Sequence, residues 1–142
     1  MGKKQQTHEA GRHLAVGQAL LSGRSASIAG HRTHIEVNGQ RAAVMVAGKG
    51  AWMIKNIETF MASSSAAYVL VNITGPVYEF FVAPGDELRR DVRQRHERFL
   101  ARVVTRPRNS KSLHSNIKPQ DVTRWADNWA LFDRAQLDSN PG

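Results

Sequence analysis

The stretch HIEVNGQRAAVMVA, residues 34–47, decides the expected fold. Its centre, Asn38-Gly39, is the strongest short signal for a β-hairpin turn. The apolar run that follows, over residues 42–47, is typical of a central strand that is buried on both faces. We therefore expect a hairpin with one strand over residues 33–37 and its return strand over residues 41–47.

Further elements are expected on both sides of this hairpin. Apolar residues at helical spacing predict a first helix over residues 8–22, with Ala10, Leu14, Gly17 and Leu21 on one stripe. A short strand should follow at 25–29, and strands at 68–73 and 77–82 should be joined by a turn at Thr74-Gly75-Pro76. Pro84-Gly85-Asp86-Glu87 should open a second long helix.

The remaining chain is expected to form a basic loop over residues 105–118 and then a final helix over 119–134. On that helix Val122, Trp125 and Trp129 recur at i, i+3 and i+7, so both tryptophans should face one way and pack on the sheet. Trp52, Tyr68 and Tyr78 have apolar neighbours, and we assign them to the core.

The length and composition bound the organisation of the protein. A chain of 142 residues is expected to form one domain with its own core. We predict a disordered tail over residues 1–7, one α/β domain over 8–134 with a small mixed central sheet flanked by helices, and a flexible tail over 135–142. The chain contains no cysteine and no apolar run near the length of a membrane span, so we expect a soluble cytoplasmic protein.

Positive charge is concentrated in one part of the chain. The formal net charge is +8, which favours a polyanionic partner. Residues 1–88 carry eight basic and six acidic side chains, whereas residues 89–118 carry ten basic and two acidic ones. The alternative interpretation of this segment is a solvated surface without a partner.

The second long helix is expected to pack through Leu88, Val92, Phe99 and Val103 and to expose its arginines. The expected nucleic-acid-binding residues are Arg89, Arg90, Arg93, Arg98, Arg102, Arg106, Arg108 and Lys111.

The hairpin stretch resembles the core of the PD-(D/E)XK, or restriction-endonuclease-like, family. In that family one strand bears an Asp, a tight turn follows, and the next strand carries Glu-x-Lys. The stretch Glu79 to Pro84 running into a helix, and the segment from Trp125 to Leu131, also resemble later parts of the family. The resemblance covers roughly residues 10–132 and implies a nuclease-like fold.

The catalytic residues that the resemblance implies are replaced. His34 stands at the position of the Asp, Ala43 at the Glu and Met45 at the Lys. If the second strand is shifted by two residues, Met45 stands at the Glu and Ala47 at the Lys. Alanine and methionine offer no oxygen ligand for Mg²⁺. Glu36, on the strand face of His34, and Lys49, on that of Ala43, are the candidates for a relocated site.

No other site is indicated by the sequence. The histidine pairs His31/His34 and His8/His13 lack a third ligand at zinc-site spacing, so no metal and no cofactor is expected; Mg²⁺ enters only with a relocated nuclease site.

Three functions remain open from the sequence. The first is a nucleic-acid-binding protein of nuclease-like fold that has lost its metal-dependent site, with DNA as the ligand by analogy alone. The second is a protein-interaction or assembly module, with a protein partner or a homodimer. The third is a metal-dependent nuclease with relocated residues.

Overall fold

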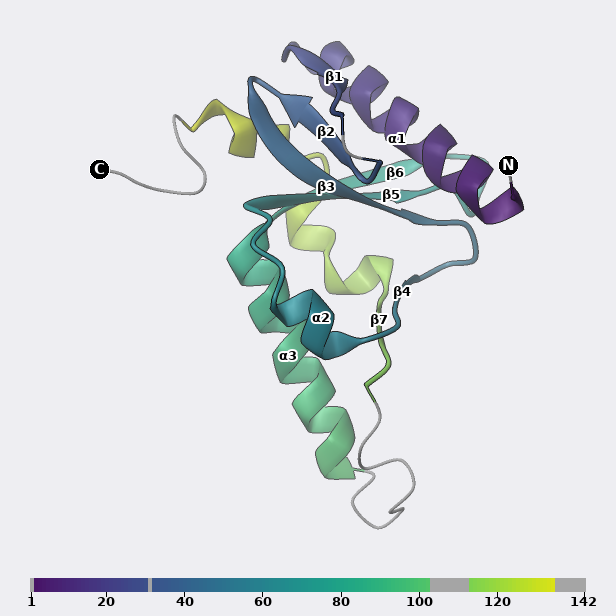
Figure 1. Cartoon of the computed structure of the whole chain (residues 1–142), viewed down its shortest axis with the longest axis vertical. Helices are drawn as coiled ribbons and strands as arrows, with labels where there is room; N and C mark the ends of the chain where they lie inside the picture. The colour runs from purple at the N-terminus through teal and green to yellow at the C-terminus, as the bar shows by residue number, and fades with distance from the viewer. Residues whose placement is uncertain (1, 31, 103–112, 135–142) are drawn as a thin grey trace.

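The computed structural model describes residues 2–30, 32–102 and 113–134, and it has a mixed α/β fold (Figure 1). Its α-helices and strands are, in chain order, α1 (Lys3–Leu21), β1 (Ala26–Ile28), β2 (His34–Val37), β3 (Gln40–Ala47), β4 (Trp52–Ile54), α2 (Ile57–Met61), β5 (Ala67–Asn72), β6 (Glu79–Pro84), α3 (Gly85–Arg102) and β7 (Ser115–Ile117). Three short 3-10 helices follow, η2 (Pro119–Asp121), η3 (Thr123–Trp125) and η4 (Trp129–Asp133).

The central sheet has five strands in the order β1-β2-β3-β5-β6. Neighbours β3 and β5 are parallel, and the other pairs are antiparallel. A parallel pair needs a crossover connection, and the segment with β4 and α2 provides it. Strands β4 and β7 form a separate two-stranded sheet. The prediction of an α/β fold with a small mixed sheet flanked by helices is confirmed.

The predicted hairpin is also confirmed. Strands β2 and β3 pair antiparallel on either side of Asn38-Gly39, whose φ angles are 53° and 77°. Positive φ at both central residues is the geometry that favours Asn-Gly in such turns. The Asn38 side chain also donates to the carbonyl of Phe132 at 3.2 Å, so the turn helps to hold the C-terminal segment in place.

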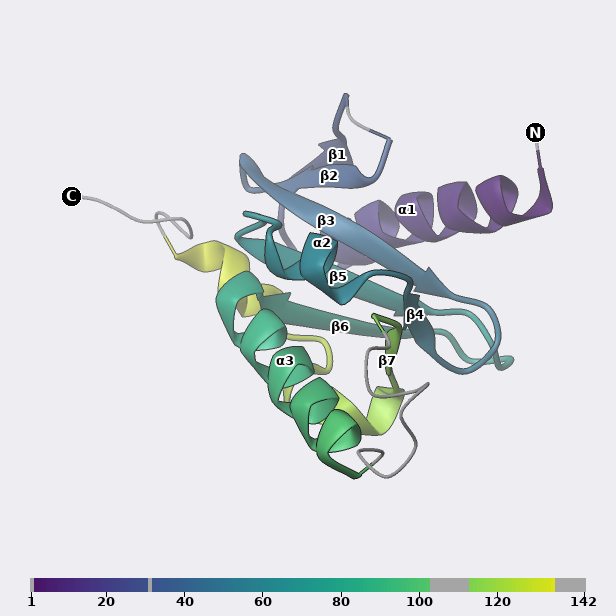
Figure 2. The same ribbon diagram turned by 60° about the horizontal axis from the view of Figure 1, so that its bottom comes forward.

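Helices cover both faces of the sheet, with α1 on one face and α2 and α3 on the other (Figures 1 and 2). Alternate residues of each strand therefore enter two hydrophobic clusters. Val44, Val69 and Val82 lie in the cluster on the α1 side, whereas Leu70 and Phe81 lie in the cluster on the α3 side. Within the part of the chain that the structure describes, no helix combines the length and apolar character needed to cross a membrane.

Helix α1 begins at Lys3, so residues 3–7 of the segment predicted as a disordered tail over residues 1–7 are helical. The Gly2 amide donates to Gln5 Oε1 at 3.0 Å, and the Thr7 hydroxyl donates to the Lys3 carbonyl at 3.1 Å. His8 Nε2 lies 3.1 Å from the carbonyl oxygen of Val44. These hydrogen bonds hold the polar first turns of the helix. The prediction missed them because it relied on the periodicity of apolar residues.

The buried residues of α1 also differ from the predicted stripe. Gly11, Ala15 and Ala19 face the sheet, while Leu21 is 84% exposed. Small residues suit this face because α1 crosses β3 closely: a Cβ built on Gly11 would lie 2.3 Å from Val46 Cγ2. The helix thus packs largely through small residues, with Leu14 and Val16 partly buried against the same cluster and Leu20 and Leu21 exposed.

The predicted final helix over residues 119–134 is wrong. The segment contains the three 3-10 helices instead. The last two, η3 and η4, are separated by a turn at Asp127, which has a φ of 50°. There the chain runs along the outer edge of β6: the Asp127 amide donates to the Phe80 carbonyl at 2.9 Å, and Asn128 Nδ2 donates to the Val82 carbonyl at 3.1 Å. These bonds satisfy edge groups of β6 that a continuous helix would leave free.

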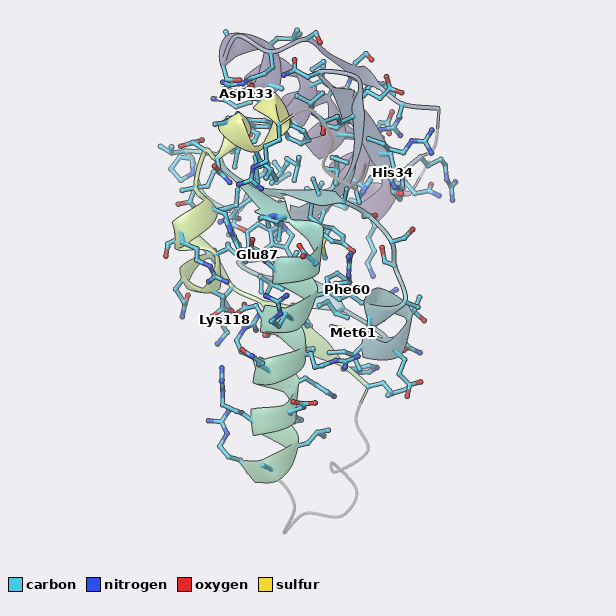
Figure 3. All side chains as sticks on the ribbon, turned by 90° about the vertical axis from the view of Figure 1, so that its left-hand side faces the viewer. His34, Phe60, Met61, Glu87, Lys118 and Asp133 are labelled. Atoms are coloured by element: carbon cyan, nitrogen blue, oxygen red, sulfur yellow. The ribbon has the colours of Figure 1, made fainter. Side chains whose placement is uncertain are left out.

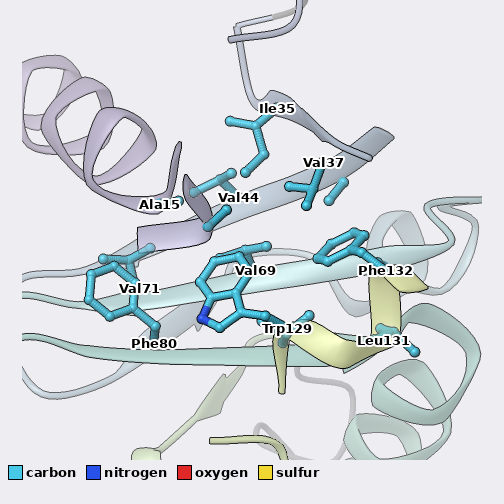
Figure 4. Close-up of a cluster of buried hydrophobic side chains, with 14 residues drawn as sticks. Ala15, Ile35, Val37, Val44, Val69, Val71, Phe80, Trp129, Leu131 and Phe132 are labelled. Atoms are coloured by element: carbon cyan, nitrogen blue, oxygen red, sulfur yellow. The ribbon is translucent and has the colours of Figure 1, made fainter. Parts of the chain in front are cut away.

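The two tryptophans of this segment consequently lie on opposite faces of the sheet, not on one. Trp125 belongs to the cluster on the α3 side, and Trp129 belongs to the cluster on the α1 side. Figure 4 shows Trp129 beside Phe132 and Leu131, against Val69 and Phe80 of the sheet. The segment therefore closes both clusters.

An ion pair fixes the end of this segment to the turn after α1. Arg24 Nε lies 3.1 Å from Asp133 Oδ1, and Arg24 Nη2 lies 2.6 Å from Oδ2. The side-chain hydrogen bond from Arg24 lowers the pKa of Asp133 below its ordinary value, with burial acting in the opposite direction. A carboxylate with a lowered pKa stabilises the folded state above its unfolded pKa, near 4.

We therefore expect this stabilisation to disappear as the pH falls from about 4 through the lowered pKa of folded Asp133. Urea unfolding of the wild type and of Asp133→Asn, measured between about pH 2.5 and 7, checks this. The two unfolding free energies should differ near neutral pH and converge in acid. Two parallel curves would show that the ion pair does not contribute.

Candidate functional site

The hairpin places the positions of the implied catalytic residues together. His34 and Ala43 are directly opposite each other in the β2–β3 register, and Met45 lies on the same face of β3 two residues further on. That face is turned toward α2 and α3, where Ala43 and Met45 pack against the hydrophobic cluster. No oxygen donor is contributed by either residue, so the position is suited to packing and not to holding Mg²⁺.

Glu36 and Lys49, the candidates for a relocated site, are both exposed. Glu36 lies opposite Arg41 near the start of β3, whereas Lys49 follows the end of that strand. The six residue-to-residue steps of strand from 41 to 47 span about 20 Å. The structure therefore does not bring these two side chains together around one ion.

The histidines do not gather into a metal site in the part of the chain that the structure describes. No group of three or more His, Cys, Asp or Glu side chains lies close enough there to hold an ion. His8 and His13 are on α1, with His13 Nε2 3.4 Å from Glu9 Oε2. His31 lies outside the described residues.

The predicted binding arginines divide into several groups on α3. Arg89 points inward: its Nη1 donates to the Ser65 carbonyl at 2.9 Å and to the Tyr68 hydroxyl at 3.2 Å. Arg93 lines a groove that also contains the carboxylates of Glu58 and Glu97. These carboxylates would repel a phosphate near Arg93. Arg89 is not well placed to bind a phosphate either, because its guanidinium is already bonded to Ser65 and Tyr68.

The other predicted residues differ among themselves. Arg90 is exposed, and Arg98 and Arg102 line a cavity between α3 and the β4–β7 sheet. Arg106, Arg108 and Lys111 lie outside the described residues, as does Val103 of the predicted packing stripe. Among the described members of the predicted set, only Arg98 and Arg102 line this cavity.

The cavity has a volume of about 590 Å³. We call it the basic pocket. Its lining residues with cationic or titratable side chains are Arg95, His96, Arg98, Arg102, His114 and Lys118, together with one carboxylate, Asp121. Lys118 comes from the segment after β7 and lies beside α3, well apart from His34 of the hairpin (Figure 3). Among the described residues no carboxylate lies within ion-pair distance of Arg98, Arg102 or Lys118.

Arg95 holds the walls of the basic pocket together. Its Nε lies 3.2 Å from Asp91 Oδ2, its Nη1 lies 3.4 Å from Asp121 Oδ2, and Nη1 also donates to the Asn116 carbonyl at 3.0 Å. These contacts join α3 to β7 and η2. The positive charge of Arg95 is thereby balanced, which leaves Arg98, Arg102 and Lys118 as the cations available to a ligand.

Two apolar side chains also reach the pocket, Met53 of β4 and Phe99 of α3. Phe99 stacks on His96, with ring centroids 6.1 Å apart and an angle of 28° between the rings. His96 is buried and takes the place that Phe99 was predicted to hold in the packing stripe after Leu88 and Val92. Spacing could have identified it, since residues 88, 92 and 96 are each four apart.

Three further aromatic residues of the predicted core had different outcomes. Trp52 and Tyr68 are buried as predicted, whereas Tyr78 is 47% exposed. Tyr78 lies before β6, which begins at Glu79 and not at the predicted residue 77. It is far from the basic pocket in sequence and is not among its lining residues.

Comparison of the chain with family models, with curated proteins and with solved structures gives no match. The geometry of the chain itself is therefore the basis for assigning a function.

Proposed function

We propose that this chain binds nucleic acid, with DNA as the first ligand to test, through the basic pocket. The observation that carries the proposal is the convergence of Arg98, Arg102 and Lys118 on one cavity. Asp121, the carboxylate among the described lining residues, is ion-paired with Arg95, and no described carboxylate lies within ion-pair distance of the three cations. Cations held apart from acidic partners attract polyanions, and each phosphate contact releases counterions from the nucleic acid.

We further propose that binding occurs on a nuclease-like fold without metal-dependent cleavage. The β2–β3 hairpin and the passage of β6 directly into α3 support this proposal, because the resemblance rests on both features. His34, Ala43 and Met45 do not supply the oxygen ligands and the amine that the reaction would need.

The test is a salt titration of binding to labelled single-stranded and duplex DNA, for the wild type and for Arg98→Ala, Arg102→Ala and Lys118→Ala. We expect each substitution to weaken binding several-fold at low salt and to reduce the slope of log K against log salt by about 0.9 on duplex DNA and about 0.7 on single strands. Arg90→Ala is the matched control, because it removes the same charge from an exposed position of α3 that does not line the pocket. Its effect should be clearly smaller.

Two results would contradict the proposal. Absence of wild-type binding at low salt would exclude nucleic acid as the ligand and favour an interaction module. Equal losses for Arg90→Ala and the pocket variants would show that net charge, and not the basic pocket, governs binding. The same DNAs incubated with Mg²⁺ should remain intact; cleavage would favour a nuclease with relocated residues.

A further inference from the structure

The basic pocket contains more than cations. Phe99 of α3 is 36% exposed and Met53 of β4 is 65% exposed, and both line the cavity. These apolar side chains contribute nothing to binding a phosphate. The cavity volume of about 590 Å³ is in the size range of pockets that bind small organic ligands. The pocket therefore has space and apolar surface for a ring as well as for a phosphate.

The Phe99 ring is supported in a manner that suits stacking. One side of it lies near the buried ring of His96, at a centroid distance of 6.1 Å, and His96 is only 7% exposed. The side chain of Phe99 is thereby held by the protein while part of its surface stays open to the pocket. Aromatic side chains placed beside cations form the usual platform for bases of single-stranded nucleic acid.

We propose that the basic pocket receives one unpaired nucleotide, its base against Phe99 and Met53 and its phosphate near Arg98, Arg102 and Lys118. This inference rests on the proposed function and specifies its ligand. In a duplex the faces of the bases are stacked and inaccessible, so blunt duplex DNA can offer the pocket only its phosphates. A single strand, or a duplex with a single-stranded overhang, offers both groups.

The experiment compares the binding of three probes to the full chain by fluorescence anisotropy at fixed salt. The probes are a single strand, a blunt duplex of the same sequence, and an abasic form of the single strand. The abasic strand lacks the bases but keeps every sugar and phosphate. We expect wild type to bind the single strand about 10-fold more tightly than the abasic strand or the blunt duplex.

Substitution of Phe99 separates base contacts from phosphate contacts. Phe99→Ala should lower affinity for the single strand about 10-fold, leave the abasic strand and the blunt duplex unchanged, and preserve the salt slope. Phe99→Trp keeps an aromatic surface and should retain the preference. Arg98→Ala should weaken binding to all three probes and reduce the slope by about 0.7 for the single strands.

The outcomes distinguish this inference from the function on which it rests. If wild type binds none of the probes, the proposed function fails and the inference fails with it. If wild type binds all three probes equally, or if Phe99→Ala keeps the preference for the single strand while remaining folded by circular dichroism, the chain binds nucleic acid without inserting a base. In either case the base-binding role of Phe99 is refuted.

Discussion

Replacement of Gly85 by alanine is expected to lower the free energy of unfolding by about 3 kcal/mol. Gly85 begins α3 where β6 ends, and its amide donates to the Ala66 carbonyl at 2.8 Å. A Cβ at this position would lie 1.9 Å from the carbonyl oxygen of Ser65. Because the clash is with backbone, no side-chain rotation can relieve it, and the start of α3 must move.

The clash would also disturb Arg89, which donates to the same Ser65 carbonyl. Urea denaturation followed by tryptophan fluorescence measures the loss. Gly75→Ala is the matched control, because a Cβ on Gly75 has no heavy atom within 4 Å; it should change stability by less than about 0.5 kcal/mol. Equal unfolding midpoints for the two variants would show that α3 does not approach Ser65 so closely.

Substitution of Trp52 by alanine should cost about 3–5 kcal/mol of stability. The side chain is 1% exposed, its Nε1 donates to the Val71 carbonyl at 3.2 Å, and its ring meets Phe81 edge-on at a centroid distance of 5.7 Å. It anchors β4 to the central sheet, and β4 carries Met53 of the basic pocket.

Trp52→Phe provides the comparison for this prediction. It keeps an aromatic ring but removes the donor to Val71, and the net contribution of one such hydrogen bond is about 0.5–1.5 kcal/mol. We therefore expect its free energy of unfolding to fall between those of the wild type and Trp52→Ala. A loss below about 1 kcal/mol for Trp52→Ala would mean that β4 is held by other contacts.

The parts of the fold that the sequence predicted are those set by local chemistry. Asn38-Gly39 requires only its own backbone angles to make the hairpin turn, and the buried strand β5 is apolar throughout its centre. The C-terminal segment was mispredicted because the spacing of Val122, Trp125 and Trp129 fits a helix. Hydrogen bonds to the edge of β6, which are distant in sequence, outweigh that periodicity.

The candidate site shows the same limit. Charge alone selected Arg98 and Arg102, which line the basic pocket. It also selected Arg89, whose partners Ser65 and Tyr68 lie more than twenty residues away. Lys118 and Met53 were missed because their place in the basic pocket depends on the pairing of β4 with β7. Three-residue strands joined across sixty residues leave no local pattern to detect.

The path of the C-terminal segment around β6 affects how the chain folds during its synthesis. All five strands of the central sheet are complete once Pro84 has been added. Trp125 on one face, and Trp129 and Phe132 on the other, are made about forty to fifty residues later. Until then both faces of the sheet lack part of their hydrophobic cover. The nascent chain therefore exposes apolar strand residues, which chaperones can bind, before it can reach its final structure.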